Sequence, residues 1–136
     1  MGKEEITAIE HKLIAATSTD EFMAFMDEAT VRYDYLPPLQ YVGGPAVRAN
    51  LALFFDNAKN AKGKFVSLDV TADEQLGIAY SLMYFTWTGP DGKPAEATFR
   101  VTHCFHKAKG EWKIFHSHVS FPINPATGQA EMNLKE

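Results

Sequence analysis

The sequence T-F-R-V-T-H-C-F-H runs from Thr98 to His106, and W-K-I-F-H-S-H-V-S-F follows from Trp112 to Phe121. Both stretches are rich in β-branched and aromatic residues that alternate with polar ones, which predicts two β-strands. Residues 107–111 between them predict the turn of a hairpin. Four of the five histidines of the chain lie in this hairpin, so it is the first candidate for a functional surface.

The composition is that of an ordinary globular protein. The chain has 136 residues, of which 46% are hydrophobic and 22% charged, and this suffices for one domain with its own core. The net charge of −4 argues against nucleic-acid binding, which usually needs a basic face. No apolar stretch is long enough to span a membrane, and the charged N-terminal segment does not resemble a signal peptide. The single cysteine, Cys104, suits a reducing compartment, so we expect a cytoplasmic protein.

Helices are expected first and strands later. Apolar spacing, a possible capping box at Ser18 and a proline at position 45 predict three helices, over residues 4–16, 18–28 and 45–59. Strands besides the hairpin are expected over residues 29–35, 65–71 and 77–88. This order predicts an α+β fold with sequential antiparallel strands, as one domain over residues 1–123 and a polar tail over residues 124–136.

Alternation along a strand divides the hairpin into two faces. The larger aromatic set is expected to pack under the helices, since otherwise large rings face water on both sides of the sheet. The expected inner face is formed by Phe99, Val101, His103, Phe105, Phe115, Ser117, Val119 and Phe121. The opposite face is expected to form a homodimer interface that includes Arg100, Thr102, Trp112, His116 and His118.

His103 is the strongest candidate for chemistry, because it lies alone among apolar residues. Two interpretations remain open: a core histidine satisfied by one hydrogen bond, or an imidazole that faces a cavity and exchanges protons near neutral pH. Asp34, beside Tyr33, is the carboxylate of an otherwise aromatic stretch, and a turn or cap role is an equal alternative for it. The walls of such a cavity are expected to include Tyr80, Leu82 and Tyr84.

A metal site is the competing interpretation of the histidines. His116 and His118 are two residues apart on one strand, and Cys104 could approach them from across the hairpin. No acidic fourth ligand is evident on these strands. We therefore expect no metal and no cofactor, and favour the subunit interface.

Several motifs resemble the SnoaL-like family of the nuclear transport factor 2-like superfamily. They are A-T-V near the first strand, L-Q-Y-V-G-G-P-A-V before the third helix, I-A-Y in a later strand and G-x-W-x-I-x-H-x-H-x-S at the end. The resemblance covers about residues 5–123, and the closing motif is also similar to the association domain of calcium/calmodulin-dependent kinase II. It implies a cone, in which a curved antiparallel sheet wraps around helices and encloses a pocket, often with a dimer formed through the sheet.

The resemblance does not carry the catalytic set of the ketosteroid isomerases. Their aspartate base follows A-T-V-E, whereas A-T-V-R-Y places Tyr33 at that position and Asp34 one residue later. One residue reverses the face unless a bulge intervenes. The second acid of the isomerases falls at about His103 and their helix tyrosine near Ile9, so steroid isomerisation by that mechanism is not expected.

The comparison with the kinase association domain predicts the character of the pocket. The pocket arginines of that domain fall at Leu82, His103 and Val119 in this chain. We therefore expect a less basic pocket that takes a neutral, partly apolar ligand, to which Arg48 could restore one positive group.

Two functions remain in different classes. One is an acid–base enzyme, such as an isomerase, cyclase or dehydratase, in which His103 works with Asp34 or Tyr33. Its substrate would contact Tyr80, Leu82, Tyr84, Phe105, Phe115, Ser117 and Val119. The other is a non-catalytic module for ligand binding or oligomerisation, because a fold alone does not decide function.

Overall fold

In the computed structural model, which describes residues 2–135, the chain begins with helix α1 (Gly2–Ile14). Ile6 and Leu13 are buried on one stripe of this helix, and Glu10 is buried between them. Acidic residues in the first turn and basic residues in the last turn complement the helix dipole. The helix therefore carries one charged group into the interior together with its apolar face.

Two further helices follow the predicted signals. Helix α2 (Thr19–Met23) begins at the predicted cap, where the Ser18 hydroxyl accepts a hydrogen bond from the Glu21 N–H at 3.2 Å. It ends earlier than predicted, because the chain enters strand β1 (Met26–Tyr33). Helix α3 (Gly44–Asn57) has a proline in its first turn, as predicted.

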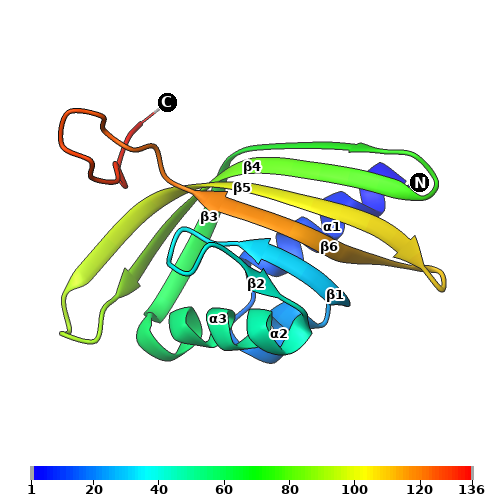
Figure 1. The fold of residues 1–136 in the computed structure, drawn as a ribbon, viewed down its shortest axis with the longest axis horizontal. Coiled ribbons are helices and arrows are strands. Elements are labelled where there is room, and N and C mark those ends of the chain that lie inside the picture. Colours follow the sequence, from blue (N-terminus) through cyan, green and yellow to red (C-terminus); the bar gives the residue numbers. More distant parts are fainter. Residues whose placement is uncertain (1, 136) are drawn as a thin grey trace.

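Six strands form one sheet in the order β2-β1-β6-β5-β4-β3 (Figure 1). The strands besides β1 are β2 (Tyr41–Val42), β3 (Lys59–Ala72), β4 (Leu76–Thr88), β5 (Pro94–Ala108) and β6 (Glu111–Ser120). All neighbours are antiparallel except β1 and β6, which are parallel. The predicted antiparallel sheet is thus corrected to a mixed one. The long connection through α3 and four strands allows β1 and β6 to run in the same direction.

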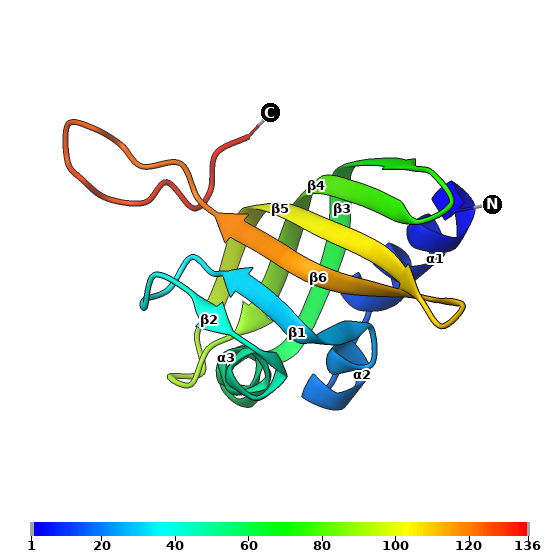
Figure 2. The ribbon, with the colours of Figure 1, turned by 45° about the vertical axis from the view of Figure 1, so that its right-hand side comes forward.

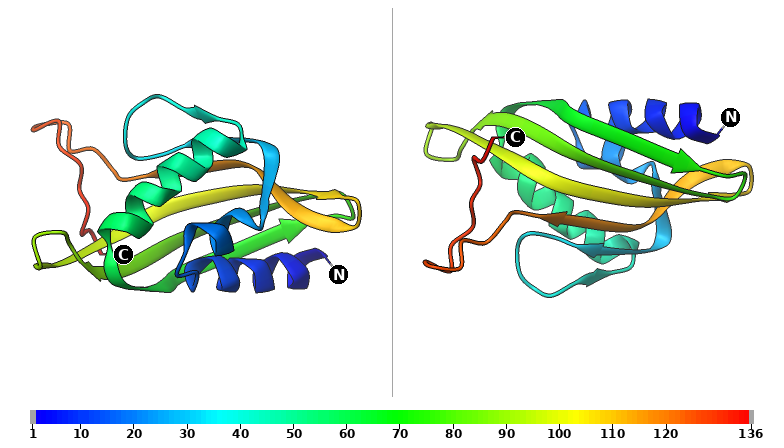
Figure 3. Two further views of the ribbon diagram at one scale, coloured as in Figure 1. Left: turned by 90° about the horizontal axis from the view of Figure 1, so that it is seen from below. Right: turned by 90° about the horizontal axis from the view of Figure 1, so that it is seen from above.

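The sheet curves around the helices, which all lie on one of its faces (Figures 2 and 3). This confirms the predicted α+β fold with a curved sheet wrapped around helices. Within residues 2–135, no helix has the length and the apolar character needed to cross a membrane.

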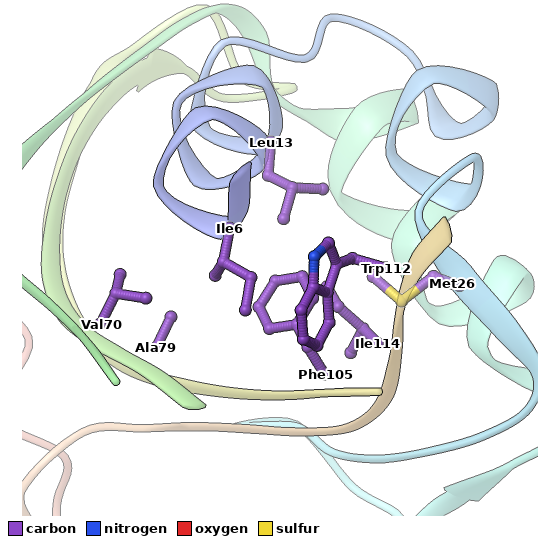
Figure 4. Packing of buried hydrophobic residues seen from close by; sticks show 8 residues of the cluster. All are labelled: Ile6, Leu13, Met26, Val70, Ala79, Phe105, Trp112 and Ile114. Atoms are coloured by element: carbon purple, nitrogen blue, oxygen red, sulfur yellow. The ribbon is translucent and has the colours of Figure 1, made fainter. Parts of the chain in front are cut away.

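Two clusters of buried apolar side chains fill the inner face. The first lies beneath α1 (Figure 4) and contains Ile6, Leu13, Met26, Val70, Ala79, Phe105, Trp112 and Ile114. The second lies toward the other end of the long strands and contains Met83, Ala97, Phe99, Val101, Val119 and Phe121. The first cluster closes one end of the cone with packed side chains.

A β-bulge in β6 changes which side chains of this strand face inward. The pairing with β5 shifts by one residue at Phe115, which is therefore the extra residue of the bulge. Trp112 and Ile114 lie inside before the bulge, and Ser117 and Val119 lie inside after it. Two expectations are corrected: Phe115 is 37% exposed and does not face the interior, and Trp112 is buried and is not part of the outer face.

The chain after β6 folds back toward the sheet. Ile123 forms an isolated bridge with Ala130, and the Thr98 N–H of β5 donates to the Met132 carbonyl at 2.8 Å. Residues 1 and 136, the outer ends of the predicted domain (1–123) and tail (124–136), lie outside the described residues. That division stays a prediction.

Candidate active site

A cavity of about 460 Å³ lies between the sheet and helix α3, beyond the cluster that α1 covers. Its volume is in the range of small-molecule sites. Its walls are mainly apolar and rich in aromatic rings, including Phe22, Phe54, Phe85, Trp87 and Phe99. Phe54 packs edge-to-face against both Phe85 and Trp87, with ring centroids 5.9 and 6.1 Å away.

Three polar side chains bond to one another on one wall of the cavity. Arg32 Nε donates to Asn50 Oδ1 at 2.8 Å, and Arg32 Nη2 donates to Asp34 Oδ1 at 3.3 Å. Asn50 Nδ2 donates to Asp34 Oδ2 at 3.0 Å and closes the triangle. The side chains of Arg32 and Asp34 are only 9% and 3% exposed. The cavity wall therefore holds a compensated ion pair rather than a free charge.

Burial changes the acid–base properties of two groups at this wall. It lowers the pKa of Arg32, and the neighbouring Asp34 carboxylate opposes this effect, so the guanidinium keeps its charge. Burial also raises the pKa of Tyr35, and the charge of Asp34 raises it further. The Tyr35 ring packs 5.2 Å from both Phe99 and Phe121, so its hydroxyl remains protonated at the edge of the cavity.

His103 lines the cavity and is paired with a carboxylate behind it. His103 Nδ1 lies 2.6 Å from Glu10 Oε2, and the two side chains are 2% and 1% exposed. Among residues 2–135, no group bonds to His103 Nε2. In the tautomer whose Nδ1–H donates to the Glu10 carboxylate, the lone pair of the ring lies on Nε2. This is the arrangement of a histidine base oriented by a carboxylate.

Strand register aligns these groups across the sheet. Arg32 lies opposite Ser117 in the β1–β6 pairing, and Ser117 lies opposite His103 in the β5–β6 pairing. Neighbouring strands are about 4.8 Å apart, so the Arg32 and His103 backbones are separated by roughly 10 Å. One polar row thus crosses the inner face of the sheet.

The structure separates the two candidate residues of the first strand. Asp34 lines the cavity, whereas Tyr33 lies on the outer face, where its ring packs against His116 and His118 at 4.7 and 5.5 Å. Tyr33 is therefore corrected from a catalytic candidate to an outer-face residue. The cause is a register irregularity in the pairing of β1 with β6, before Val31, which turns Arg32 and Asp34 inward.

Most of the predicted substrate contacts lie elsewhere. Val119 lines the cavity, whereas Phe105 and Ser117 are buried in the interior outside its lining. On β4 the small or flexible residues Ala79, Ser81 and Met83 face inward. The outer face instead carries Tyr80, Leu82 and Tyr84, so all three are corrections. Leu82 and Tyr84 line a second cavity of about 480 Å³, which lies between the outer face and the C-terminal segment.

Glu10, Arg32 and Asn50 were not among the residues predicted for the site. Glu10 had a signal in the sequence, because it is a charged residue on the same stripe of the helix as the apolar Ile6 and Leu13. The R-x-D spacing on a strand was a weaker signal for Arg32. Arg48 does not reach the cavity, because its exposed guanidinium pairs with Asp20 at 2.6 Å.

The outer histidines are held by local contacts. His116 Nδ1–H donates to the Val31 carbonyl at 2.9 Å, which fixes this ring against β1. Burial raises the pKa of the Cys104 thiol, so it is a weak thiolate ligand. Within residues 2–135, no three His, Cys, Asp or Glu side chains are grouped so that they could hold a metal ion.

Comparison with known proteins identifies the family. Residues 5–124 match the SnoaL-like domain. An NTF2-like protein of unknown function from Pseudomonas putida is 22% identical, with a TM-score of 0.87 over 99% of this chain and 96% of that one. An NTF2-like superfamily protein from Salmonella enterica serovar Typhimurium is 17% identical, with a TM-score of 0.80 over 95% of this chain and 96% of that one.

A third solved structure comes from Xanthomonas campestris and is described as a putative calcium/calmodulin-dependent protein kinase II association domain. It is 19% identical, with a TM-score of 0.76 over 85% of this chain and 84% of that one. No match was found among curated proteins. At these identities the solved structures establish the fold alone, whereas the family match covers most of the chain and confirms the predicted resemblance. The chain belongs to the SnoaL-like domain family.

Proposed function

We propose that this protein binds a neutral, largely apolar small molecule in the inner cavity and transfers a proton on it through His103. The observation that carries the proposal is the Glu10–His103 pair at the cavity wall, with Nδ1 bonded to Glu10 and Nε2 without a partner among the described residues. The aromatic walls favour an apolar ligand, and the Arg32–Asp34 pair leaves little net charge to attract an ion.

The geometry assigns complementary tasks to the two side chains. His103 Nε2 accepts a proton from one atom of the ligand and returns it to another, so the total number of protons on protein and ligand is unchanged. The Glu10 carboxylate orients the ring through Nδ1–H and stabilises the imidazolium formed between the two steps. Such chemistry serves an isomerase directly, and a cyclase or dehydratase as its acid–base step.

Mass spectrometry of the molecules that co-purify with the protein tests the proposal. His103→Asn keeps a donor near Glu10 but cannot take up a proton, and His118→Asn on the exposed outer face is the matched control. We expect wild type and His118→Asn to release the same small molecule, and His103→Asn to retain its unconverted precursor or lose it. A ligand identical in kind and amount in all three proteins would remove His103 from the site.

Isotope exchange gives a second readout once the ligand is known. Incubation with the protein in D₂O should label the ligand at the carbon from which His103 removes the proton. His103→Asn should slow this labelling at least 100-fold, the usual contribution of a general base. Labelling at an undiminished rate would contradict the proton transfer and leave only ligand binding.

The outer face of the sheet supports a second proposal, that two copies of the chain associate there. Leu76, Ile78 and Tyr80 are about half exposed on the outer face of β4, at 54%, 47% and 54%. Arg100, Thr102, His116 and His118 lie on the same face and supply the polar part of the proposed homodimer interface. The similarity to a structure described as an association domain favours this proposal.

Sedimentation at several protein concentrations tests the association. We expect Ile78→Lys to shift the protein to monomer, because it places a charge in the centre of the proposed interface. Val42→Lys, at a position 61% exposed on the edge strand β2, is the control and should leave the association unchanged. A monomeric wild type, or a dimer that both variants preserve, would refute this interface.

A further inference from the structure

The second cavity, which we call the outer groove, gathers positive charge in a chain that is negative overall. Its volume is about 480 Å³, in the range of small-molecule sites, and it lies between strands β3, β4 and β5 and the C-terminal segment. Three cations, Lys64, Arg100 and Lys135, line it together with a single carboxylate, Glu131. The whole chain has a net charge of −4, so this local excess of cations marks the groove as a candidate site for an anion.

Backbone hydrogen bonds hold the wall that the C-terminal segment provides. The Glu131 N–H donates to the Pro122 carbonyl, and the Thr98 N–H of β5 donates to the Met132 carbonyl, both at 2.8 Å. The segment thereby returns to the sheet on the face opposite to the helices, and Lys135 reaches the groove (Figure 3). The groove is therefore built by the folded chain and is not a gap beside a loose end.

Two of the cations converge on one aromatic ring. Lys64 Nζ lies 5.6 Å from the ring centroid of Tyr84, and Lys135 Nζ lies 5.1 Å from the same centroid. The two ammonium groups cannot be further apart than the sum of these distances, although they come from β3 and from the C-terminal segment. The Tyr84 hydroxyl donates to Glu96 at 2.6 Å, and this bond raises the pKa of Tyr84, so the ring between the two cations stays neutral.

Strand register places the third cation beside this ring. Tyr84 pairs with Thr98 and Leu82 pairs with Arg100, so Arg100 lies one strand across and two residues along from Tyr84. The backbones of these two residues are therefore roughly 8 Å apart. Arg100 Nε donates to Ser120 Oγ at 3.1 Å, which orients the guanidinium and leaves its two terminal nitrogens available.

The cations of the groove have no carboxylate partner. Within residues 2–135, no Asp or Glu side chain forms an ion pair with Lys64, Arg100 or Lys135. The carboxylate of the groove, on Glu131, accepts from Asn124 Nδ2 at 2.9 Å within its own segment. The positive charge of the groove is therefore available to an anion from solution.

The rest of the groove is apolar and can be reached from solution. Val66, Leu82, Pro122 and Leu134 line it, and the side chains of Val66 and Leu134 are 40% and 52% exposed. An inorganic anion would leave these side chains in water, whereas a hydrocarbon body would cover them.

We propose that the outer groove binds a free organic acid that carries one carboxylate on an apolar body. The carboxylate lies among the charged groups of Lys64, Arg100 and Lys135, and the apolar body covers Val66 and Leu134. The sheet separates this site from the inner cavity, so binding here is independent of the proton transfer proposed for His103.

The groove and the proposed homodimer interface occupy different parts of the outer face. The interface is centred on Leu76, Ile78 and Tyr80, whereas the groove begins at Leu82 of the same strand. Arg100 lies at the border between them. Substitutions of the two lysines therefore report on the groove alone.

Calorimetric titration with three compounds of equal chain length tests the inference: octanoate, 1-octanol and octylammonium. We expect octanoate to bind at least tenfold more tightly than the other two, because the alcohol lacks the charge and the ammonium is repelled. Raising the salt concentration should weaken the binding of octanoate and leave that of 1-octanol unchanged.

Methyl NMR spectra locate the bound octanoate. The resonances of Val66, Leu82 and Leu134 report on the outer groove, and those of Val101 and Val119 report on the inner cavity. We expect octanoate to shift the first group at concentrations that match the calorimetric binding.

The double variant Lys64→Gln/Lys135→Gln should weaken octanoate at least tenfold and leave 1-octanol unchanged. Lys3→Gln/Lys12→Gln removes the same charge from exposed positions of α1, on the other face of the sheet, and should change neither. Leu134→Asp, at a half-exposed position, places a carboxylate in the groove without disturbing the core and should abolish octanoate binding.

Several results would overturn the outer site. They are no binding of octanoate, equal or tighter binding of 1-octanol or octylammonium, NMR shifts confined to the inner cavity, and octanoate binding that the double lysine variant leaves unchanged. None of these results bears on the proposed function, because that function depends on His103 and the inner cavity.

Discussion

A carboxylate on the buried stripe of α1 is costly unless another group compensates it, and Glu10 meets this condition through His103 alone. Its Oε2 accepts from His103 Nδ1 at 2.6 Å, while its Oε1 has no partner within residues 2–135. An apolar residue at this position would pack with Ile6 and Leu13 at no such cost. The presence of an acid here is therefore better explained by the proposed chemistry of His103 than by stability.

Removing His103 should reveal the energetic cost of burying the Glu10 carboxylate. His103→Ala leaves the Glu10 carboxylate buried without its partner, and we expect it to lower the free energy of unfolding by about 3–5 kcal/mol. The double variant Glu10→Leu/His103→Ala should recover part of this loss, because no buried charge remains. Urea unfolding measures both, with Glu74→Leu as an exposed control. A double variant less stable than His103→Ala would contradict the pairing.

At the scale of elements, alternation predicted the faces of β5 and of β6 after Phe115 correctly, and the prediction was wrong for β4 and for β6 up to Phe115. Phe99, Val101, His103 and Phe105 all lie inside, as expected. In β6 the single extra residue of the bulge, Phe115, reversed the face of everything before it, and a bulge leaves no sign in an alternating pattern.

In β4 the larger side chains were expected inside, and the close approach of α1 explains why they are outside. A Cβ atom placed on Gly77 would lie 2.3 Å from Ile6 Cδ1, so only small residues fit at this crossing. The neighbouring inward residue is Ala79, while Tyr80 and Leu82 point to the other side. The distance between the helix and the sheet depends on tertiary packing, so it cannot be predicted from the sequence of one strand.

This close packing predicts a specific sensitivity. Gly77→Val introduces a residue that favours strands, yet it must displace the fully buried Ile6, and we expect it to lower the free energy of unfolding by about 1–3 kcal/mol. Ile78→Val next to it, on the exposed face, should change stability by less than about 0.5 kcal/mol. Thermal unfolding compares the two variants. Equal free energies of unfolding for the two variants would mean that α1 does not pack tightly against β4 at Gly77.

At the scale of the whole molecule, the two ends of the cone differ. One end is filled by the cluster under α1, and the other keeps a cavity of about 460 Å³. The family motifs predicted this shape, including the presence of an inner space. The polar groups of that space come from β1 and the residue after it, from α3 and from β5, and Glu10 of α1 lies behind His103. They meet only in the folded chain, so single-strand patterns identified His103 and Asp34 but not Glu10 or Asn50.

Filling the cavity should separate stability from ligand binding. Val101→Phe adds apolar atoms to its wall, so we expect the free energy of unfolding to stay equal or rise by about 1 kcal/mol, while the co-purifying ligand is lost. Thr102→Phe, the adjacent residue on the outer face, should leave the ligand in place. Unfolding curves and mass spectrometry report the two properties. Retention of the ligand by Val101→Phe would place it outside the cavity.

The parallel pairing of β1 with β6 has a consequence for how the protein is made. Arg32 and Tyr33 emerge early in translation, but their partners on β6, Ser117 and His118, emerge near its end. Contacts between residues so far apart in the sequence slow folding, because a large loop must lose entropy by closing before these contacts can stabilise the chain. Wild-type chains should therefore leave the ribosome before they acquire any capacity for ligand.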